Sequence, residues 1–254
     1  MLKHKNIIVL CSLCLVLLFI THAAWWTFLV LTVFFLGMTS WGSFDIRLNY
    51  FLKAYHNNPN EKERRIALTF DDGPHEMTEE VLNLLQKFNA KATFFCIGAQ
   101  IEKHPDILKR TIAEGHVIGN HTYSHSNSIG FFSTAKVLTE IEKNDALLST
   151  AVGRKIKLFR PPFGVTNPNI TRVVSRTGHY VIGWNIRSLD TLNIDENAIF
   201  ERVKKRIQPG GIILLHDTSL KTVTVLERLL LFLQSENYEM VTIDTLLNLP
   251  AYEN

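Results

Sequence analysis

Apolar residues fill the start of the chain almost without interruption. Residues 7–44 contain no Lys, Arg, Asp or Glu, and the polar pair Thr21-His22 divides them into two runs. A membrane-spanning helix needs about 20 predominantly apolar residues, so this segment is too long for one span and just long enough for two. We predict a transmembrane anchor at residues 1–44, formed as a helical hairpin with spans at 7–23 and 25–44.

Two other interpretations of this segment stay open. Its first run has the length of a cleaved signal peptide, although the second run favours retention. Two spans return both chain ends to one side, and the basic residues around the segment place that side in the cytoplasm by the positive-inside rule. A single long, tilted or partly re-entrant span would instead export the rest of the chain. Tryptophans near both ends of the second run suit the membrane interface.

A polar connector at 45–63 precedes a segment, 64–254, in which strand-like and helix-like runs alternate. The expected strands are at about 65–70, 91–97, 116–120, 157–160, 180–185, 211–215 and 239–243. The expected helices are at about 78–88, 99–114, 133–150, 168–177, 195–207, 219–235 and 244–249. Such alternation predicts a parallel sheet covered by helices, here a distorted (β/α) barrel of about seven strands, with its chemistry at the carboxyl ends of the strands.

Composition narrows the class of protein further. The chain has 254 residues, 46% of them hydrophobic, which permits one large domain besides the anchor. The net charge of +3 comes without a basic stripe, so we expect no nucleic-acid partner. Two cysteines, Cys11 and Cys14, lie in the apolar segment and Cys96 lies in an expected strand, so no structural disulfide is expected. The oligomeric state is not predicted.

Charged and histidine side chains follow five of the expected strands. The first strand ends in Asp71-Asp72 before the breaker pair Gly73-Pro74. Adjacent residues of an extended chain point to opposite sides. We therefore expect one carboxylate to face a metal and the other to act as a base. The alternative is that this tetrad is only a turn.

The histidines His121 and His125 stand four residues apart after the third strand. In a helical turn they would face the same way and, with one Asp, supply a two-histidine, one-carboxylate site for Zn²⁺ or a similar divalent metal. A non-haem iron oxygenase uses the same ligand set. That alternative explains neither the double Asp nor Arg160, which follows the fourth strand.

Four motifs in order carry a resemblance to a known family. They are Thr69-Phe-Asp-Asp-Gly-Pro74, His121-Thr-Tyr-Ser-His125, Arg160-Pro-Pro-Phe163 and Leu214-Leu-His216. With these motifs, residues 64–250 resemble the polysaccharide deacetylase family, the NodB-type domain of carbohydrate esterases. The resemblance implies a TIM-like α/β fold and a metal-dependent hydrolase.

Applied to this chain, the resemblance implies a role for each motif residue. Asp72, His121 and His125 would bind the metal, and Asp71 would be the general base that activates the attacking water. Arg160 would hold Asp71 in place and keep it ionised, since a neighbouring cation favours the carboxylate.

The remaining motif residues would complete the reaction. His216 would be the general acid that protonates the leaving amine, and Asp190 would pair with it and raise its pKa. The backbone N–H of Phe163 would stabilise the oxyanion. Phe163 and Leu214 would line a small pocket for the acetyl methyl group.

The chain departs from the family pattern near the fifth strand. Arg187 stands where the family often has Asp, and Thr191 stands where it often has a pocket-lining Trp. The departure affects the shape of the substrate site rather than the chemistry. Arg187 is either an ordinary surface residue or a contact for an anionic group on the substrate.

These observations predict a membrane-anchored, Zn²⁺-dependent hydrolase that removes N-acetyl groups from amino sugars of a cell-envelope polysaccharide. The expected partners are an N-acetylated glycan and the lipid bilayer. The expected location is a bacterial inner membrane with the catalytic domain on the outside. Two alternatives are a deacylase of a lipid-linked amino sugar and a catalytically silent glycan-binding module. A binding module has no need of Asp71 or His216.

Overall fold

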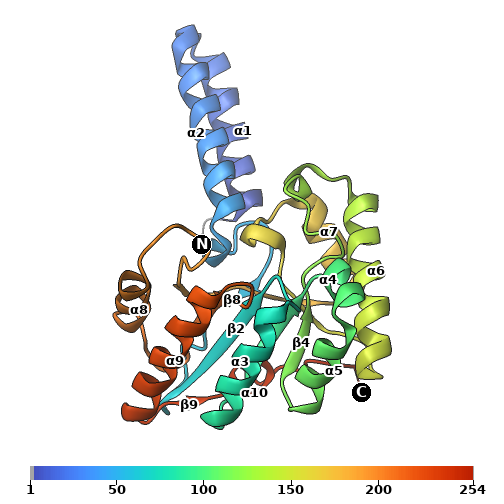
Figure 1. Cartoon of the computed structure of the whole chain (residues 1–254). Helices are drawn as coiled ribbons and strands as arrows, with labels where there is room; N and C mark the ends of the chain where they lie inside the picture. Colours follow the sequence, from blue (N-terminus) through green and yellow to red (C-terminus); the bar gives the residue numbers. More distant parts are fainter. Residues whose placement is uncertain (1–2, 254) are drawn as a thin grey trace.

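Two apolar helices stand outside the main body of the protein (Figure 1). The computed structural model describes residues 3–253, so residues 1, 2 and 254 of the predicted anchor and domain lie outside it. Helices α1 (His4–Ile20) and α2 (Trp25–Phe44) pack against each other as a hairpin. Among the described helices, α2 alone is long and apolar enough to cross a membrane, and α1 has 17 residues.

The hairpin is joined to the main body at its open end. The backbone N–H of His4 donates to the carbonyl of Tyr50 (3.0 Å), and the rings of the two residues lie 5.3 Å apart. At the end of α2, Gly42 packs so closely on Tyr50 that any side chain there would collide with its ring. The carbonyl of Ser43 accepts from the backbone of Thr166 (3.0 Å). The hairpin is therefore packed on the domain rather than loosely linked to it.

A parallel sheet that curls into a half-barrel forms the centre of the main body (Figure 1). The strand order is β1-β6-β5-β4-β3-β2-β8-β7, and β9 pairs with β2. The strands are β1 (Ala54–Tyr55), β2 (Arg65–Asp71), β3 (Ala92–Cys96), β4 (Val117–Asn120), β5 (Leu158–Phe159), β6 (Tyr180–Ile182), β7 (Ile186–Arg187), β8 (Ile212–His216) and β9 (Glu239–Met240). The predicted α/β architecture is confirmed.

Helices cover the outer face of this sheet (Figure 1). They are α3 (Glu76–Lys87), α4 (Gly98–Lys103), α5 (Pro105–Ala113), α6 (Thr134–Val152), α7 (Pro168–Thr177), α8 (Glu196–Lys204) and α9 (Leu220–Ser235). The short helix α10 (Ile243–Leu247) instead contributes Ile243 and Leu246 to the apolar cluster inside the curl of the sheet. Three short 3₁₀ turns complete the secondary structure: η1 (Ile46–Leu48), η2 (Ile129–Phe131) and η3 (Pro162–Gly164).

Most boundaries differ from the expected ones by a few residues, and three differences change the elements themselves. The helix expected at 99–114 is two helices, because Pro105 cannot donate a helical hydrogen bond and starts α5. The strand expected at 180–185 ends at Ile182 as β6, and a separate short strand, β7, follows at Ile186–Arg187 and pairs with β8 at the other end of the sheet. Ala54–Tyr55, within the expected connector, pairs with β6 as β1, so part of that segment belongs to the sheet.

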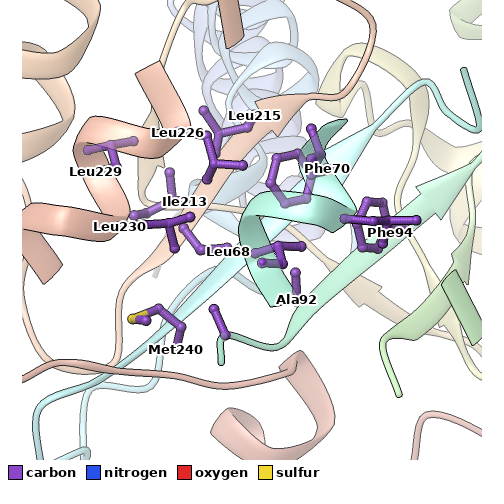
Figure 2. Close-up of a cluster of buried hydrophobic side chains, with 14 of the residues drawn as sticks. Leu68, Phe70, Ala92, Phe94, Ile213, Leu215, Leu226, Leu229, Leu230 and Met240 are labelled. Atoms are coloured by element: carbon purple, nitrogen blue, oxygen red, sulfur yellow. The ribbon is translucent and has the colours of Figure 1, made fainter. Parts of the chain in front are cut away.

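The alternation of side chains along the central strands separates an outer apolar cluster from an inner one, and a third cluster lies at β5 and β6. Leu68 and Phe70 of β2 pack with Ile213 and Leu215 of β8 under α3 and α9, as Figure 2 shows. The intervening residues of these strands, such as Ala67, belong to a second cluster inside the curl of the sheet. The strand residue that continues the inner series therefore points into the half-barrel at its carboxyl end.

Candidate active site

Three polar residues continue the inward-facing positions of three strands at the carboxyl ends of those strands. In β2, Ala67 and Thr69 precede Asp71; in β8, Leu214 precedes His216. Arg160 follows β5 in the same alternation. The register pairs Asp71 directly with His216. The two-residue period of the strands and their register thus bring a carboxylate, an imidazole and a guanidinium group to one end of the half-barrel, where the sequence predicts the site of a barrel-type fold.

Asp71 and Arg160 form a buried ion pair. Arg160 Nη1 donates to Asp71 Oδ1 (2.7 Å) and to Thr69 Oγ1 (2.8 Å). The other guanidinium nitrogens donate to the carbonyls of Ile182 (3.1 Å) and Gly183 (3.0 Å). The guanidinium group is fully buried and every nitrogen has a partner, so the carboxylate it holds has a fixed position.

Asp72, His121 and His125 converge on one point. Asp72 Oδ1 lies 3.5 Å from His121 Nε2 and 3.3 Å from His125 Nε2, and the three ligand atoms all lie within 4.8 Å of one another. That spread is slightly wider than the roughly 4 Å expected for ligands about 2 Å from one Zn²⁺. It allows a single cation to contact all three after small side-chain movements.

The local backbone that produces this convergence differs from the prediction. Asp72 is not extended but left-handed (φ 76°), so its carboxylate turns to the same histidine that Asp71 approaches (His121 Nε2 to Asp71 Oδ2, 3.8 Å). The expectation that the two carboxylates point to opposite sides is therefore wrong. The loop from His121 to His125 is not a helical turn either. Positive φ angles at Thr122 and His125 bring the two rings to a centroid distance of 4.9 Å.

The chemistry of these three side chains fits a divalent metal. Asp72 Oδ1 is buried and has no hydrogen-bond partner, which is costly unless a cation binds it. His121 Nδ1 lies 2.7 Å from the carbonyl of Arg160, so this nitrogen carries the proton and Nε2 is free to act as a ligand. Burial lowers the pKa of His125 to about 4, which keeps its ring neutral at working pH. Burial raises the pKa of Asp72, but the neighbouring histidines outweigh it and keep the carboxylate ionised.

His216 and Asp190 form a second buried pair. His216 Nδ1 donates to Asp190 Oδ1 (2.8 Å), and the backbone N–H of His216 donates to Asp190 Oδ2 (2.8 Å). Ser188 Oγ and Thr222 Oγ1 also donate to this carboxylate (2.8 and 2.9 Å). Burial lowers the pKa of His216, but Asp190 outweighs burial and raises that pKa to about 9. The ring is thus charged at neutral pH, with Nε2 4.0 Å from Asp72 Oδ2.

Left-handed backbone conformations gather around these groups. Non-glycine residues adopt them at a cost of about 1–3 kcal/mol each unless the surroundings stabilise them. Those at the site are Asp72 (φ 76°), Thr122 (φ 66°), His125 (φ 48°), Phe163 (φ 59°) and Leu189 (φ 67°). The surrounding structure therefore stabilises these unfavourable backbone conformations, and they orient the side chains of the site.

The three expected substrate residues take different places. The ring of Phe163 is half-exposed and lies 4.8 Å from that of His125. Leu214 is buried in the inner cluster with Trp184. Arg187 lies in β7 and pairs with Leu214. Its exposed side chain lines a neighbouring cavity and does not reach the cluster of Asp72, His121 and His125, called the metal cluster below.

Several supporting residues are absent from the sequence-based site. Thr69 accepts from Arg160, and its position within the first motif could have identified it. Asp217 is buried beside Thr78 Oγ1 (2.5 Å) and leaves no room for a side chain at Gly73. Burial raises the pKa of Asp217 to about 7. The side-chain amide of Asn144 donates to the carbonyls of Cys96 and Thr122 (2.9 Å each), and nothing in the sequence marks this residue.

The parallel half-barrel is the NodB-like fold of carbohydrate esterases. A family model described as polysaccharide deacetylase matches residues 58–182. A peptidoglycan-N-acetylglucosamine deacetylase of Bacillus cereus is 36% identical over 198 residues, which cover 74% of this chain and 90% of the relative. The chain belongs to the polysaccharide deacetylase family, hydrolases that remove N-acetyl groups from polysaccharides.

Solved structures agree with this assignment. That of the Bc1960 peptidoglycan N-acetylglucosamine deacetylase has a TM-score of 0.74 and 32% identity, covering 79% of this chain and 94% of that one. A CE4 family pseudoenzyme from Bacillus anthracis has a TM-score of 0.70 and 25% identity, covering 77% of this chain and 69% of that one. Since one of these folds is that of a pseudoenzyme, activity must be argued from the site residues.

Proposed function

We propose that this chain is an N-deacetylase of N-acetylglucosamine in a cell-envelope glycan, the type of substrate that its relatives' names record. The observation that carries the proposal is the convergence of three groups. The Asp71–Arg160 pair, the His216–Asp190 pair and the cluster of Asp72 with two histidines meet at one end of the sheet. Water adds to the amide carbon, the C–N bond breaks, and acetate and a free amine result.

Asp71 supplies the base in this scheme. Its Oδ1 is occupied by Arg160, while Oδ2 faces the metal cluster at 3.8 Å from His121. Oδ2 is thus placed to take a proton from a water molecule at the cluster. A divalent metal held by Asp72, His121 and His125 would polarise the amide carbonyl and acidify this water. Two imidazoles and one carboxylate suit Zn²⁺, which we propose as the native ion.

His216 supplies the acid. It must be an imidazolium to give a proton to the departing amine, and its pairing with Asp190 keeps it so. The carboxylate of Asp190 is in turn oriented by two hydroxyl groups and a backbone N–H. We assign Phe163 and Leu214 to the acetyl pocket, with the backbone N–H of Phe163 facing the developing oxyanion.

A catalytically silent glycan-binding module is the contrasting function. The pseudoenzyme relative shows that the fold occurs without activity. A module that only binds sugar gains nothing from a buried carboxylate–guanidinium pair beside a charged histidine, both aimed at a cation site. The complete set of groups in this chain therefore favours an enzyme.

Acetate release is the direct test. The Zn²⁺-loaded full-length protein should release acetate from peptidoglycan N-acetylglucosamine oligomers, lose this activity to a chelator and regain it with Zn²⁺. His125→Ala should lose both bound metal, measured by elemental analysis after dialysis, and acetate release. His104→Ala, a histidine outside the cluster, should retain both. A His125→Ala protein with full metal content would remove His125 from the ligand set, and a wild-type protein inactive on every N-acetylated amino sugar would refute the function.

We further propose that the α1–α2 hairpin, residues 7–44, anchors the protein in a membrane. The support is the apolar surface of both helices: the side chains of Leu13, Leu17, Phe19, Val30 and Val33 are each more than half exposed. The 20 residues of α2 match the thickness of a bilayer, whereas α1 reaches across only at the lower limit of length. Packing of His4 on Tyr50 supports a topology in which the N-terminus and the domain lie on the same side of the membrane.

This proposal predicts that the hairpin stays on the mature protein. Intact mass analysis of the membrane fraction should find a chain that begins before residue 7. A chain that begins beyond Ala24 would show a cleaved signal peptide instead. Reporter fusions at the C-terminus fix the side of the membrane independently, and we propose the outer side because the relatives' substrate is in the cell wall.

A further inference from the structure

Two cavities flank the candidate active site where α2 enters the domain. One, of about 520 Å³, lies between α2, the 127–131 loop and the segment around the η3 turn, and most of its lining surface is apolar, including Phe44, Phe131 and Phe163; we call it the apolar groove. The other, of about 440 Å³, lies between the end of α2, β7 and the end of α8; we call it the arginine pocket. Phe44, the last residue of α2, lines both.

The arginine pocket has a strong excess of positive charge. Four guanidinium groups line it: Arg47, Arg187, Arg202 and Arg206. Its one acidic lining residue, Asp45, is already bound by Arg47 through two hydrogen bonds (2.8 and 2.7 Å).

The other three arginines of this pocket have no carboxylate within 4 Å among the residues that the structure describes. Arg202 donates instead to the carbonyl of Arg187 (2.9 Å), and Arg206 to that of Arg202 (2.8 Å). Like charges without a counter-charge repel one another and lower the stability of the fold. The arginine cluster is therefore better explained by binding of an anion. Guanidinium groups in this arrangement suit a phosphate or diphosphate.

The apolar groove continues the surface of the hairpin. Phe131 at the tip of its loop is 93% exposed, and Phe44 is 73% exposed. Exposed aromatic side chains beside an apolar hairpin suit contact with hydrocarbon rather than water. The groove ends at Phe163, whose ring touches that of His125, so its inner end is the rim of the metal cluster.

Both cavities are lined by residues that neighbour the catalytic groups and the metal cluster, although those groups themselves line neither cavity. Arg187 pairs with Leu214, two residues before His216, and Leu189 of the arginine pocket directly precedes Asp190. Trp184, which forms the wall of that pocket, packs on the η3 turn so closely that a Cβ on Gly164 would lie 2.6 Å from its ring. A ligand that fills both cavities therefore also passes the candidate active site.

We propose that the amino sugar reaches this site attached to a membrane lipid through a phosphate or diphosphate group. The arginine pocket binds the phosphate, the apolar groove holds the first part of the hydrocarbon chain, and the N-acetyl group lies over Asp71 and the metal cluster. The inference rests on the proposed deacetylase function and specifies the form of its substrate. It also gives Arg187, which departs from the family pattern, an anionic partner on the substrate.

The test compares two substrates that share one sugar. Full-length Zn²⁺-loaded protein is assayed on N-acetylglucosamine joined by a diphosphate to a polyprenol in phosphatidylcholine vesicles, and on a soluble N-acetylglucosamine oligosaccharide. The triple variant Arg187→Gln, Arg202→Gln and Arg206→Gln should lower kcat/KM for the lipid-linked sugar by roughly 10–100-fold, since hydrogen bonds to charged groups are lost. It should leave the soluble substrate within about twofold of wild type, a change too small to reflect a lost charged contact.

Two further variants complete the test: one probes the apolar groove, and the other is a control for the loss of charge. Phe131→Ser, at a nearly fully exposed position, should raise KM for the lipid-linked sugar alone and does not disturb the core. A triple Lys→Gln variant at Lys62, Lys103 and Lys109 removes the same charge from exposed positions outside both cavities and should change neither activity.

Each outcome separates the inference from the function on which it rests. Wild-type activity on the soluble sugar but not on the lipid-linked one overturns the inference and leaves the deacetylase function intact, as does an equal loss on both substrates in the arginine variant. If that variant binds phosphatidylglycerol vesicles less well but keeps the wild-type preference between substrates, the pocket only orients the domain on lipid headgroups, and the inference is again wrong. Activity on neither substrate refutes the function itself.

Discussion

Replacing Asp71 by asparagine is expected to lower kcat by about 10²–10⁴-fold while the metal stays bound, because positioned proton transfer contributes that much to a rate. The structure separates Asp71 from the ligand cluster by its partners. Its Oδ1 accepts a hydrogen bond from Arg160, and its Oδ2 lies 3.8 Å from His121 Nε2, beside the place proposed for the attacking water. Asparagine can still accept from Arg160 but cannot take a proton from water. Steady-state kinetics and elemental analysis on the same sample give the two readouts.

The fold of this variant needs its own measurement. Arg160 is fully buried, and removing the partner of a buried charge costs about 3–5 kcal/mol when nothing replaces it. Thermal unfolding therefore accompanies the kinetics. Asp106→Asn, the same change at an exposed residue of α5, serves as the matched control. Loss of metal together with activity would make Asp71 a ligand and would overturn the division of roles between the two adjacent carboxylates.

The second large effect concerns the proton donor. His216→Ala should lower kcat by about 10²–10⁴-fold and abolish the alkaline limb of the pH–rate profile. Asp190→Asn should keep the acid but move that limb to lower pH. With Asp190 in place the pKa of His216 is raised to about 9, so the ring loses its proton only above neutral pH. Without the carboxylate, burial lowers the pKa, and the active protonated form disappears earlier as pH rises.

A full pH–rate profile of kcat measures this shift. Asp195→Asn is the matched control, because Asp195 caps α8 a few residues later and asparagine caps helices as well as aspartate does. Its profile should coincide with that of the wild type. An unchanged alkaline limb in Asp190→Asn would mean that the buried pair only fixes the β7–α8 connection, and another group would have to protonate the amine.

The strand ends were predictable because a strand has a period of two and parallel strands share one carboxyl edge. Those rules place Asp71, Arg160 and His216 on the inner face at the same edge. The alternation of runs predicted the α/β class for the same reason. The family resemblance added the division of roles, which the geometry accommodates without testing it.

The geometry of the loops was not predictable from these rules. Positive φ angles at Asp72, Thr122 and His125 depend on long-range contacts that hold the backbone in an unfavourable region. The two-residue strand β1 has no pattern of its own and exists because β6 offers an open edge. Arg202 and Arg206 look like an ordinary charged helix end in the sequence. They become a pocket only because β7 and the end of α2 pack beside them.

The contacts between the hairpin and the domain fix the distance between the active site and the membrane in which the hairpin is proposed to lie. Backbone hydrogen bonds from His4 to Tyr50 and from Thr166 to Ser43 tie the domain to the bases of both helices. With the hairpin in a bilayer as proposed, the active site cannot move away from the membrane. A domain on a flexible linker could do so, because the reach of a linker grows with its length. If the hairpin is a membrane anchor as proposed, sugars deep in a mature wall would lie out of reach. The enzyme would then meet its substrate at the membrane surface, before the glycan leaves the layer in which it is made.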